Sequence, residues 1–231
     1  FPENYLKNIN QNIDVMQSFD FGVKHMPPTR KSSTQEAVKM LTDAYKNGSL
    51  TLVLGSGVSA VYGLPGWDFL LQRLLIKTIE DTPEKAAILS RVFTKIFNPS
   101  PLSAGRYLQE SLVDQKVRNK FEEDVRNALY ETYNEKAESK IMSEIVKLCV
   151  APGYSPNLDS IITYNYDDVL EMKLRQTSMD VPFQSIYGQG VNPDDSSLEI
   201  YHVHGYLPKE GKLSDHNRVT LGEYVYHEQY N

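Results

Sequence analysis

Three short apolar runs in the chain each end in residues that can bind a ligand or react with it. Residues 50–54 lead into Gly55-Ser56-Gly57-Val58-Ser59, residues 160–163 into Tyr164-Asn165-Tyr166-Asp167-Asp168, and residues 199–203 into His204-Gly205. As buried strands of a parallel sheet, these runs place their carboxyl ends where such sheets bind ligands. The three ends together predict one site more strongly than any single motif does.

The glycine-rich turn at 55–59 has the composition of a phosphate-binding turn. Gly55 and Gly57 allow a tight turn and a close approach of the backbone to an anion. The amides at the start of the following helix point at that anion, and Ser59 adds a hydroxyl donor. A purely structural turn between a strand and a helix has the same composition, so the motif by itself leaves both interpretations open.

The other two strand ends carry residue types that serve acid–base chemistry and stabilise developing charge. Asn165 and Asp167 supply an amide and a carboxylate, and His204 supplies a group that titrates near neutral pH. Asp167 or Asp168 is also a candidate cap for the helix that follows. His202 and His204 alternate on one face of a strand, as two metal ligands would. Because no third ligand is close to them in sequence, we expect no metal and place His202 in the core or behind the site.

Periodicity and turn signals predict the elements that position these residues. Ser33 and Glu36 form an S-x-x-E capping box before a helix that ends near Gly48. Helical patterns fill most of 67–150, and strands at 160–163, 184–187 and 199–203 follow, with a helix at 169–175. We predict an α/β fold with a three-layer Rossmann-like parallel sheet and a large helical insertion. An N-terminal arm and linker at 1–32 precede one domain at 33–231.

Composition argues against several classes of protein. The formal net charge of −6 over 231 residues disfavours broad nucleic-acid binding, which needs clustered Lys and Arg. The single cysteine, Cys149, forms no internal disulfide, which fits a reducing compartment and predicts a cytoplasmic protein. It lies in an apolar run, and we interpret it as a small buried residue. No run approaches the length of about 18 apolar residues that predicts a membrane helix.

The three motifs occur in the order found in sirtuins. Residues 55–59 with Gly63-Leu64-Pro65 resemble the sirtuin signature G-A-G-x-S-x-x-x-G-I-P, residues 163–167 resemble T-Q-N-I-D, and His204-Gly205 resembles the catalytic H-G. The resemblance is closer to the sirtuin-like NAD hydrolases of bacterial antiphage defence. In that group G-L-P-x-W, Y-N-Y-D and H-V-H-G-Y recur, as they do here at 63–67, 164–167 and 202–206. The resemblance spans residues 50–231.

This resemblance implies that the protein hydrolyses NAD to nicotinamide and ADP-ribose. The resemblance implies three catalytic roles. Asn165 holds ribose hydroxyls or orients a water, and His204 is the general base. Asp167 recognises the nicotinamide carboxamide and adds negative potential. Trp67 either anchors its helix or lines the nicotinamide pocket. The NAD-binding residues that the resemblance implies are Gly55, Ser56, Gly57, Ser59, Gly63, Pro65, Trp67, Asn165 and Asp167. It also implies an NAD-depleting effector that a homo-oligomer, a sensor domain or a partner protein activates.

Two departures separate the chain from sirtuin deacylases. One cysteine excludes their four-cysteine zinc ribbon, and Gly66-Trp67-Asp68 stands where they have D-F-R. The resemblance further implies that the domain continues past Asn231 to a second nucleotide-binding motif, so that its C-terminal part lies beyond this chain. Two other functions stay open: a catalytically silent module that senses NAD or ADP-ribose, and a deacylase or ADP-ribosyltransferase. The intact Asn165, Asp167 and His204 favour catalysis.

Overall fold

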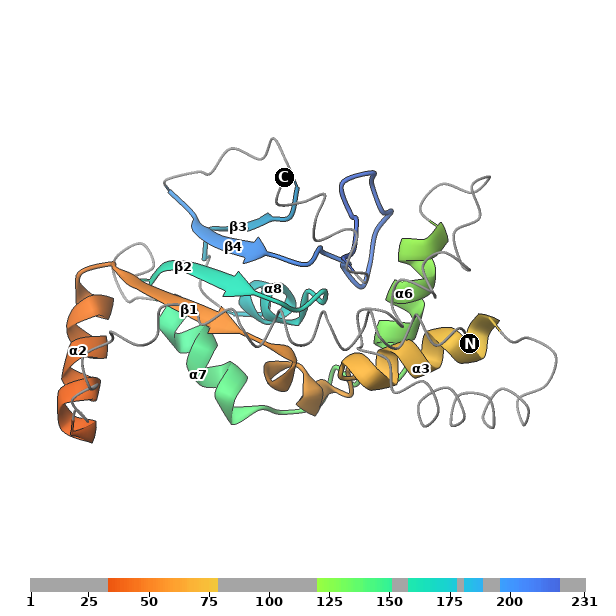
Figure 1. Ribbon diagram of the computed structural model, residues 1–231. Coiled ribbons are helices and arrows are strands. Elements are labelled where there is room, and N and C mark those ends of the chain that lie inside the picture. The colour runs from red at the N-terminus through yellow and green to blue at the C-terminus, as the bar shows by residue number, and fades with distance from the viewer. Residues whose placement is uncertain (1–32, 79–119, 151–157, 178–180, 189–195, 221–231) are drawn as a thin grey trace, which may run out of the picture. The chain divides into compact units, whose positions relative to one another are not determined.

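A parallel sheet forms the centre of the protein in the computed structural model, which describes residues 33–78, 120–150, 158–177, 181–188 and 196–220 (Figure 1). Its four strands lie in the order β1-β2-β4-β3, and every neighbouring pair is parallel. The strands are β1 (Leu50–Leu54), β2 (Leu158–Thr163), β3 (Phe183–Ile186) and β4 (Leu198–His202). The predicted α/β class with a parallel sheet is confirmed, and each predicted strand is present to within two residues.

The register of the sheet aligns the carboxyl ends of three strands. Leu54 at the end of β1 pairs with Thr163 at the end of β2, and Thr163 pairs with His202 at the end of β4. The residues that follow these strands therefore leave the sheet at the same edge, which is the edge where open parallel sheets bind ligands.

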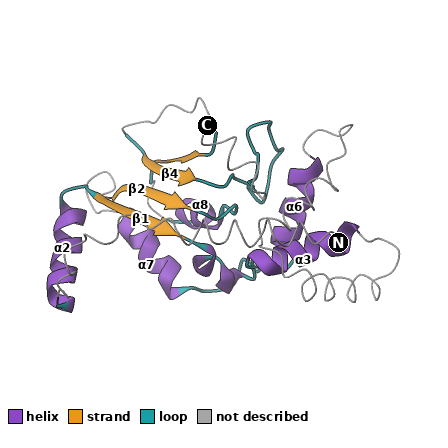
Figure 2. Cartoon of the chain, viewed as in Figure 1, coloured by secondary structure: helices purple, strands orange, loops and turns teal. Residues whose placement is uncertain are grey.

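Two helices, α7 (Lys140–Cys149) and α8 (Val169–Arg175), cover one face of the sheet (Figure 2). The connections from β1 to β2 and from β2 to β3 cross the sheet in the same direction, so right-handed crossovers place both helices on one face. The helices contact each other, and their apolar residues join Ile161 and Ile200 in the core. Cys149 of α7 is buried, as predicted. The second helical layer of the predicted three is not found among the described residues, and Val53 of β1 is 63% exposed.

The helices α3 (Trp67–Thr78) and α6 (Lys120–Tyr130) contact each other beyond the carboxyl ends of the strands (Figure 1). With α7, they lie in the region 67–150 where helical patterns are predicted, and residues 79–119 of that region lie outside the described ranges. Within those ranges, no helix combines the length and the apolar character needed to span a membrane.

The helix α2 (Thr34–Lys46) begins at the predicted capping box. Ser33 Oγ accepts a hydrogen bond from Glu36 N at 3.2 Å, and Glu36 Oε2 accepts one from Ser33 N at 2.9 Å. The chain divides into two units, Phe1–Leu41 and Thr42–Asn231, and the division falls inside α2. The predicted arm at 1–32 lies outside the described residues, and the site treated below belongs to the second unit.

Candidate functional site

The turn after β1 differs from the predicted one. Two short 3-10 helices, Ser56–Val58 and Ala60–Tyr62, follow Gly55, and an α-helix begins only at Trp67. The segment between the second 3-10 helix and α3 contains Gly63, with a φ of 82°, and Pro65. Neither residue type continues a helix, so the two helices stay separate. The amides that follow Gly57 therefore belong to 3-10 turns and not to the α-helix that we predicted.

Gly55 and Gly57 leave open space beside the backbone of this turn. A Cβ atom on either residue would meet no atom within 4 Å, and neither residue has a positive φ. Neither a positive φ nor close packing therefore accounts for these glycines, and the backbone beside them is open. Gly63 is different, because a Cβ there would lie 2.2 Å from Thr132 O, so close packing explains this glycine.

Side chains from all three strand ends line a single cavity of about 200 Å³. Ser56 comes from the turn after β1, Asn165 and Asp167 from the segment after β2, and His204 from the segment after β4. The other lining residues are Pro65, Trp67, Leu70, Leu129, Tyr164 and Tyr166. The structure thus brings together Asn165, Asp167, His204, Ser56, Pro65 and Trp67 of the predicted site. Gly55, Gly57, Ser59 and Gly63 lie outside this set.

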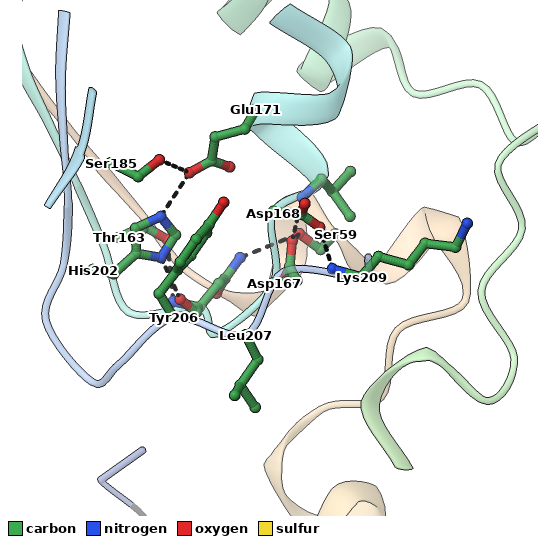
Figure 3. A network of polar contacts seen from close by, with 12 residues as sticks. Ser59, Thr163, Asp167, Asp168, Glu171, Ser185, His202, Tyr206, Leu207 and Lys209 are labelled. Carbon is green, nitrogen blue, oxygen red and sulfur yellow. Dashed lines mark hydrogen bonds and ion pairs between the residues drawn. The ribbon is translucent and has the colours of Figure 1, made fainter. Parts of the chain in front are cut away.

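A chain of hydrogen bonds connects Asn165 to Asp167 through Ser59. Figure 3 labels Ser59 and Asp167 of this chain. Asn165 Nδ2 donates to Gly55 O at 3.1 Å and to Ser59 Oγ at 3.2 Å, and Ser59 Oγ donates to Asp167 Oδ1 at 2.8 Å. Because Gly55 O only accepts, it sets the orientation of the Asn165 amide. Ser59 is 1% exposed, so its hydroxyl serves this buried chain instead of donating to a phosphate.

One acceptor oxygen on each of Asn165 and Asp167 remains available to a ligand. Asn165 Oδ1 and Asp167 Oδ2 accept no hydrogen bond from the described residues. Among those residues, a buried side-chain polar atom without a partner occurs only at Trp67 Nε1, so both oxygens keep contact with solvent. Two such acceptors suit a ligand that carries hydrogen-bond donors, such as a carboxamide or a sugar hydroxyl.

Burial shifts the pKa values of two groups that line the cavity. It raises the pKa of Asp167 to about 6, against the opposing effect of hydrogen bonds from Ser59 and Val169 N. It lowers the pKa of the half-buried His204, whose ring lies 5.0 Å from that of Tyr164 between centroids. Near pH 7, Asp167 is therefore mostly ionised and His204 is mostly neutral, so the cavity holds a carboxylate acceptor and a base.

The two histidines do not share a face of β4. The strand ends at His202, and the chain then turns, with Gly205 N donating to His202 O at 3.4 Å. His202 is buried against Glu171, whereas His204 lines the cavity. His202 is buried, as the core interpretation predicts, and the alternation on one face is wrong because the strand ends at His202. Among the described residues, no group of three or more His, Cys, Asp or Glu is placed to hold a metal ion.

The two aspartates also contact the start of α8. The N-cap residue is Asp168, whose side chain makes no cap hydrogen bond, whereas Val169 N donates to Asp167 Oδ1 at 3.2 Å, so Asp167 binds the first amide of the helix and lines the cavity at the same time. Asp168 Oδ1 accepts from Tyr130 Oη at 2.8 Å and from Lys209 N at 3.1 Å. Asp168 therefore ties α8 to α6 and to the segment that follows β4.

Sequence reasoning missed Glu171 and Tyr130, which bond residues next to the site: Glu171 is paired with His202, and Tyr130 donates to Asp168. Glu171 is fully buried on α8 between the buried Leu170 and Leu174. A lone acid among the apolar positions of a short helix is the signal that would have indicated a buried partner. For Tyr130 we find no comparable signal.

A scan against protein-family models finds no match to this chain, and a search of curated proteins finds none.

Proposed function

We propose that this protein hydrolyses NAD to nicotinamide and ADP-ribose in the cavity at the carboxyl edge of the sheet. The observation that carries the proposal is a single cavity lined by Asn165, Asp167 and the neutral His204, in which Asn165 Oδ1 and Asp167 Oδ2 accept no hydrogen bond from the described residues. Cleavage of the bond to nicotinamide builds positive charge on the ribose. A carboxylate and an amide oxygen that face this charge lower the barrier. The motif order that resembles sirtuin-like NAD hydrolases supports the same reaction.

Each polar residue has a defined role in this proposal. Asp167 accepts a hydrogen bond from the nicotinamide carboxamide and supplies negative potential. Asn165 Oδ1 holds a ribose hydroxyl or orients the attacking water, and His204 removes a proton from one of these. The cavity of about 200 Å³ is smaller than the roughly 300–1,000 Å³ of sites for drug-sized ligands, so it suits the nicotinamide riboside end. The pyrophosphate then lies along the open backbone at Gly55 and Gly57.

Following the resemblance, we also propose that the protein is an NAD-depleting effector of bacterial antiphage defence. In this scheme a homo-oligomer, a sensor domain or a partner protein switches the activity on. Activity measurements therefore belong on the activated full-length protein.

The test is nicotinamide release by wild type and by two single variants. His204→Ala removes the proposed base and is expected to lower kcat by about 10²–10⁴-fold. Asn165→Ala removes a charge-stabilising oxygen and is expected to lower kcat by about 10²–10³-fold. The matched control is His216→Ala, at an exposed histidine outside the cavity, which is expected to keep wild-type activity.

Thermal melts must accompany these assays, so that loss of fold is not mistaken for loss of chemistry. Near-wild-type turnover in both variants would show that the site is wrong. An activated wild type that binds NAD and never releases nicotinamide would favour the sensing module instead.

A further inference from the structure

A fully buried acid–base pair lies directly behind the cavity. His202 Nε2 is 2.7 Å from Glu171 Oε1, and both side chains are 1% exposed. Figure 3 shows Glu171 reaching from α8 between Ser185 of β3 and His202 of β4. Ser185 Oγ donates to the same carboxylate oxygen at 2.9 Å. Neither His202 nor Glu171 lines the cavity, so this pair acts on the cavity only through other residues.

The second ring nitrogen of His202 faces the backbone of Asn165. His202 Nδ1 is 3.1 Å from Asn165 O. A carbonyl oxygen only accepts hydrogen bonds, so Nδ1 must carry a proton. A second proton lies in the hydrogen bond between His202 Nε2 and the Glu171 carboxylate. The hydrogen bonds thus define where both protons of the pair lie.

Asn165 is held from both sides by this arrangement. Its backbone N donates to Thr163 Oγ1 at 3.1 Å, its carbonyl accepts from His202, and its side chain donates to Gly55 O and Ser59 Oγ. The space left among these groups is about 10 Å³, at the lower limit of room for one water molecule. The side-chain bonds to Gly55 and Ser59 orient the Asn165 amide, and the contact with His202 at the end of β4 holds the backbone that carries it, so both position Asn165 Oδ1, the oxygen left for a ligand.

We propose that His202 is a positioning residue for the cleavage of NAD, and that Glu171 keeps it in the form whose Nδ1–H holds the Asn165 carbonyl. The inference rests on the proposed function. Without a partner at Nε2, a neutral imidazole is free to carry its proton on Nε2 instead. The Nδ1 lone pair would then face the Asn165 carbonyl oxygen and push the residue out of place. Partners behind a site orient the groups in front of it in the same way around metal ions.

The charges around the pair agree with this proton placement. Burial favours the neutral form of His202, but the hydrogen bond and the charge of Glu171 outweigh it, so the pKa of His202 is raised. The other titratable groups that face the ring are Asp167, from the segment between β2 and α8, and Tyr206, whose ring lies 4.5 Å away between centroids.

The first test reads the proton directly, without NAD. In the full-length protein labelled with ¹⁵N-histidine, nitrogen chemical shifts at pH 7.5 report which ring nitrogens are protonated, and His202→Gln assigns the resonance. We expect Nδ1 of His202 to be protonated. An unprotonated Nδ1, which is the Nε2–H tautomer, overturns the inference.

The second test compares two variants at Glu171. In Glu171→Gln, the amide N–H donates to Nε2 and keeps the proton on Nδ1, so kcat is expected to fall by at most about threefold. Glu171→Met offers no partner to Nε2, and kcat is expected to fall by about 10–100-fold. The matched control, Tyr201→Phe, changes the neighbouring residue of β4, which bonds Glu199 instead of the pair.

The outcomes separate this inference from the proposed function. A wild type that releases no nicotinamide contradicts the proposed function, while the nitrogen spectrum still decides where the proton lies. If wild type is active and Glu171→Met matches it, His202 is not a positioning residue. If Glu171→Gln loses as much kcat as Glu171→Met at an unchanged melting temperature, the tautomer explanation is overturned.

Discussion

Asp167 is a carboxylate that the fold buries at the edge of a cavity. One of its oxygens is used by Ser59 and Val169 N, and the other accepts nothing from the described residues. Burial raises its pKa from 3.8 to about 6, so the folded state binds this proton more tightly than the unfolded chain does. The stability gained in this way is present below pH 4 and is lost as pH rises through 6. A buried charge that destabilises the fold in this way is common at functional sites.

Replacing this carboxylate by an amide is expected to stabilise the protein and inactivate it. A shift of about two pKa units corresponds to about 3 kcal/mol. At pH 7.5, Asp167→Asn is expected to raise the free energy of unfolding by about 1–3 kcal/mol, since the amide oxygen still accepts both hydrogen bonds. At pH 4 the difference is expected to be much smaller, because the wild-type carboxyl is then largely protonated. Urea unfolding at both pH values measures the effect.

The matched control for this prediction is Asp159→Asn, at an exposed aspartate of β2. It is expected to change stability by less than about 0.5 kcal/mol at either pH. An Asp167→Asn variant that is less stable than wild type at pH 7.5 would show that the buried charge does not strain the fold.

At the scale of elements, two glycines in the segment between β1 and α3 have different structural roles. At Gly57, the missing side chain leaves space that no protein atom fills. At Gly63, the positive φ and the contact with Thr132 O leave no room for a side chain. The two residues are therefore expected to respond differently to the same substitution.

Gly57→Ala is expected to change the free energy of unfolding by less than about 1 kcal/mol. It is expected to weaken NAD binding, because the new methyl group occupies the space beside the backbone. Gly63→Ala is expected to destabilise the fold by more than about 2 kcal/mol, because a Cβ 2.2 Å from a carbonyl oxygen forces the backbone to move. Chemical unfolding and NAD titration of both variants separate the two roles. A Gly57→Ala variant that binds NAD like wild type would remove the turn from the site.

The hydroxyl of Tyr130 joins α6 to the start of α8 and to the segment after β4. It donates to Asp168 Oδ1 at 2.8 Å, lies 2.9 Å from Leu207 O, and accepts from Asp168 N at 3.0 Å. Tyr130→Phe removes these three contacts, although Asp168 Oδ1 still accepts from Lys209 N, and is expected to destabilise the protein by about 1–3 kcal/mol. The matched control is Tyr133→Phe, whose hydroxyl contacts, within the described part of the chain, Met172 Sδ alone, at 3.9 Å. Equal melting temperatures for the two variants would contradict the joining role.

At the scale of the whole molecule, local signals in the sequence determined the elements and their order. The strands between turn residues, the capping box at Ser33 and Glu36, and the helix at 169–175 match the structure, whereas the predicted full burial of β1 is wrong, since of its residues only Leu54 is buried. These features depend on residues within a few positions of each other, which is why a pattern read along the chain contains them. Parallel pairing then follows from helices placed between strands, and it brings the three strand ends to one edge.

Only the tertiary structure decided how the residues of the site use their polar atoms. Ser59 and Asp167 are 108 positions apart, and His202 and Glu171 are 31 apart, yet each pair shares a buried hydrogen bond. Whether a hydroxyl serves a ligand or a neighbouring carboxylate depends on the register of β1, β2 and β4 and on the packing of α8. The 3-10 turns after Gly55 were missed for the same reason, since Gly63 packs against Thr132 on a distant segment. Burial and long-range hydrogen bonds are properties of the folded arrangement, and no local pattern specifies them.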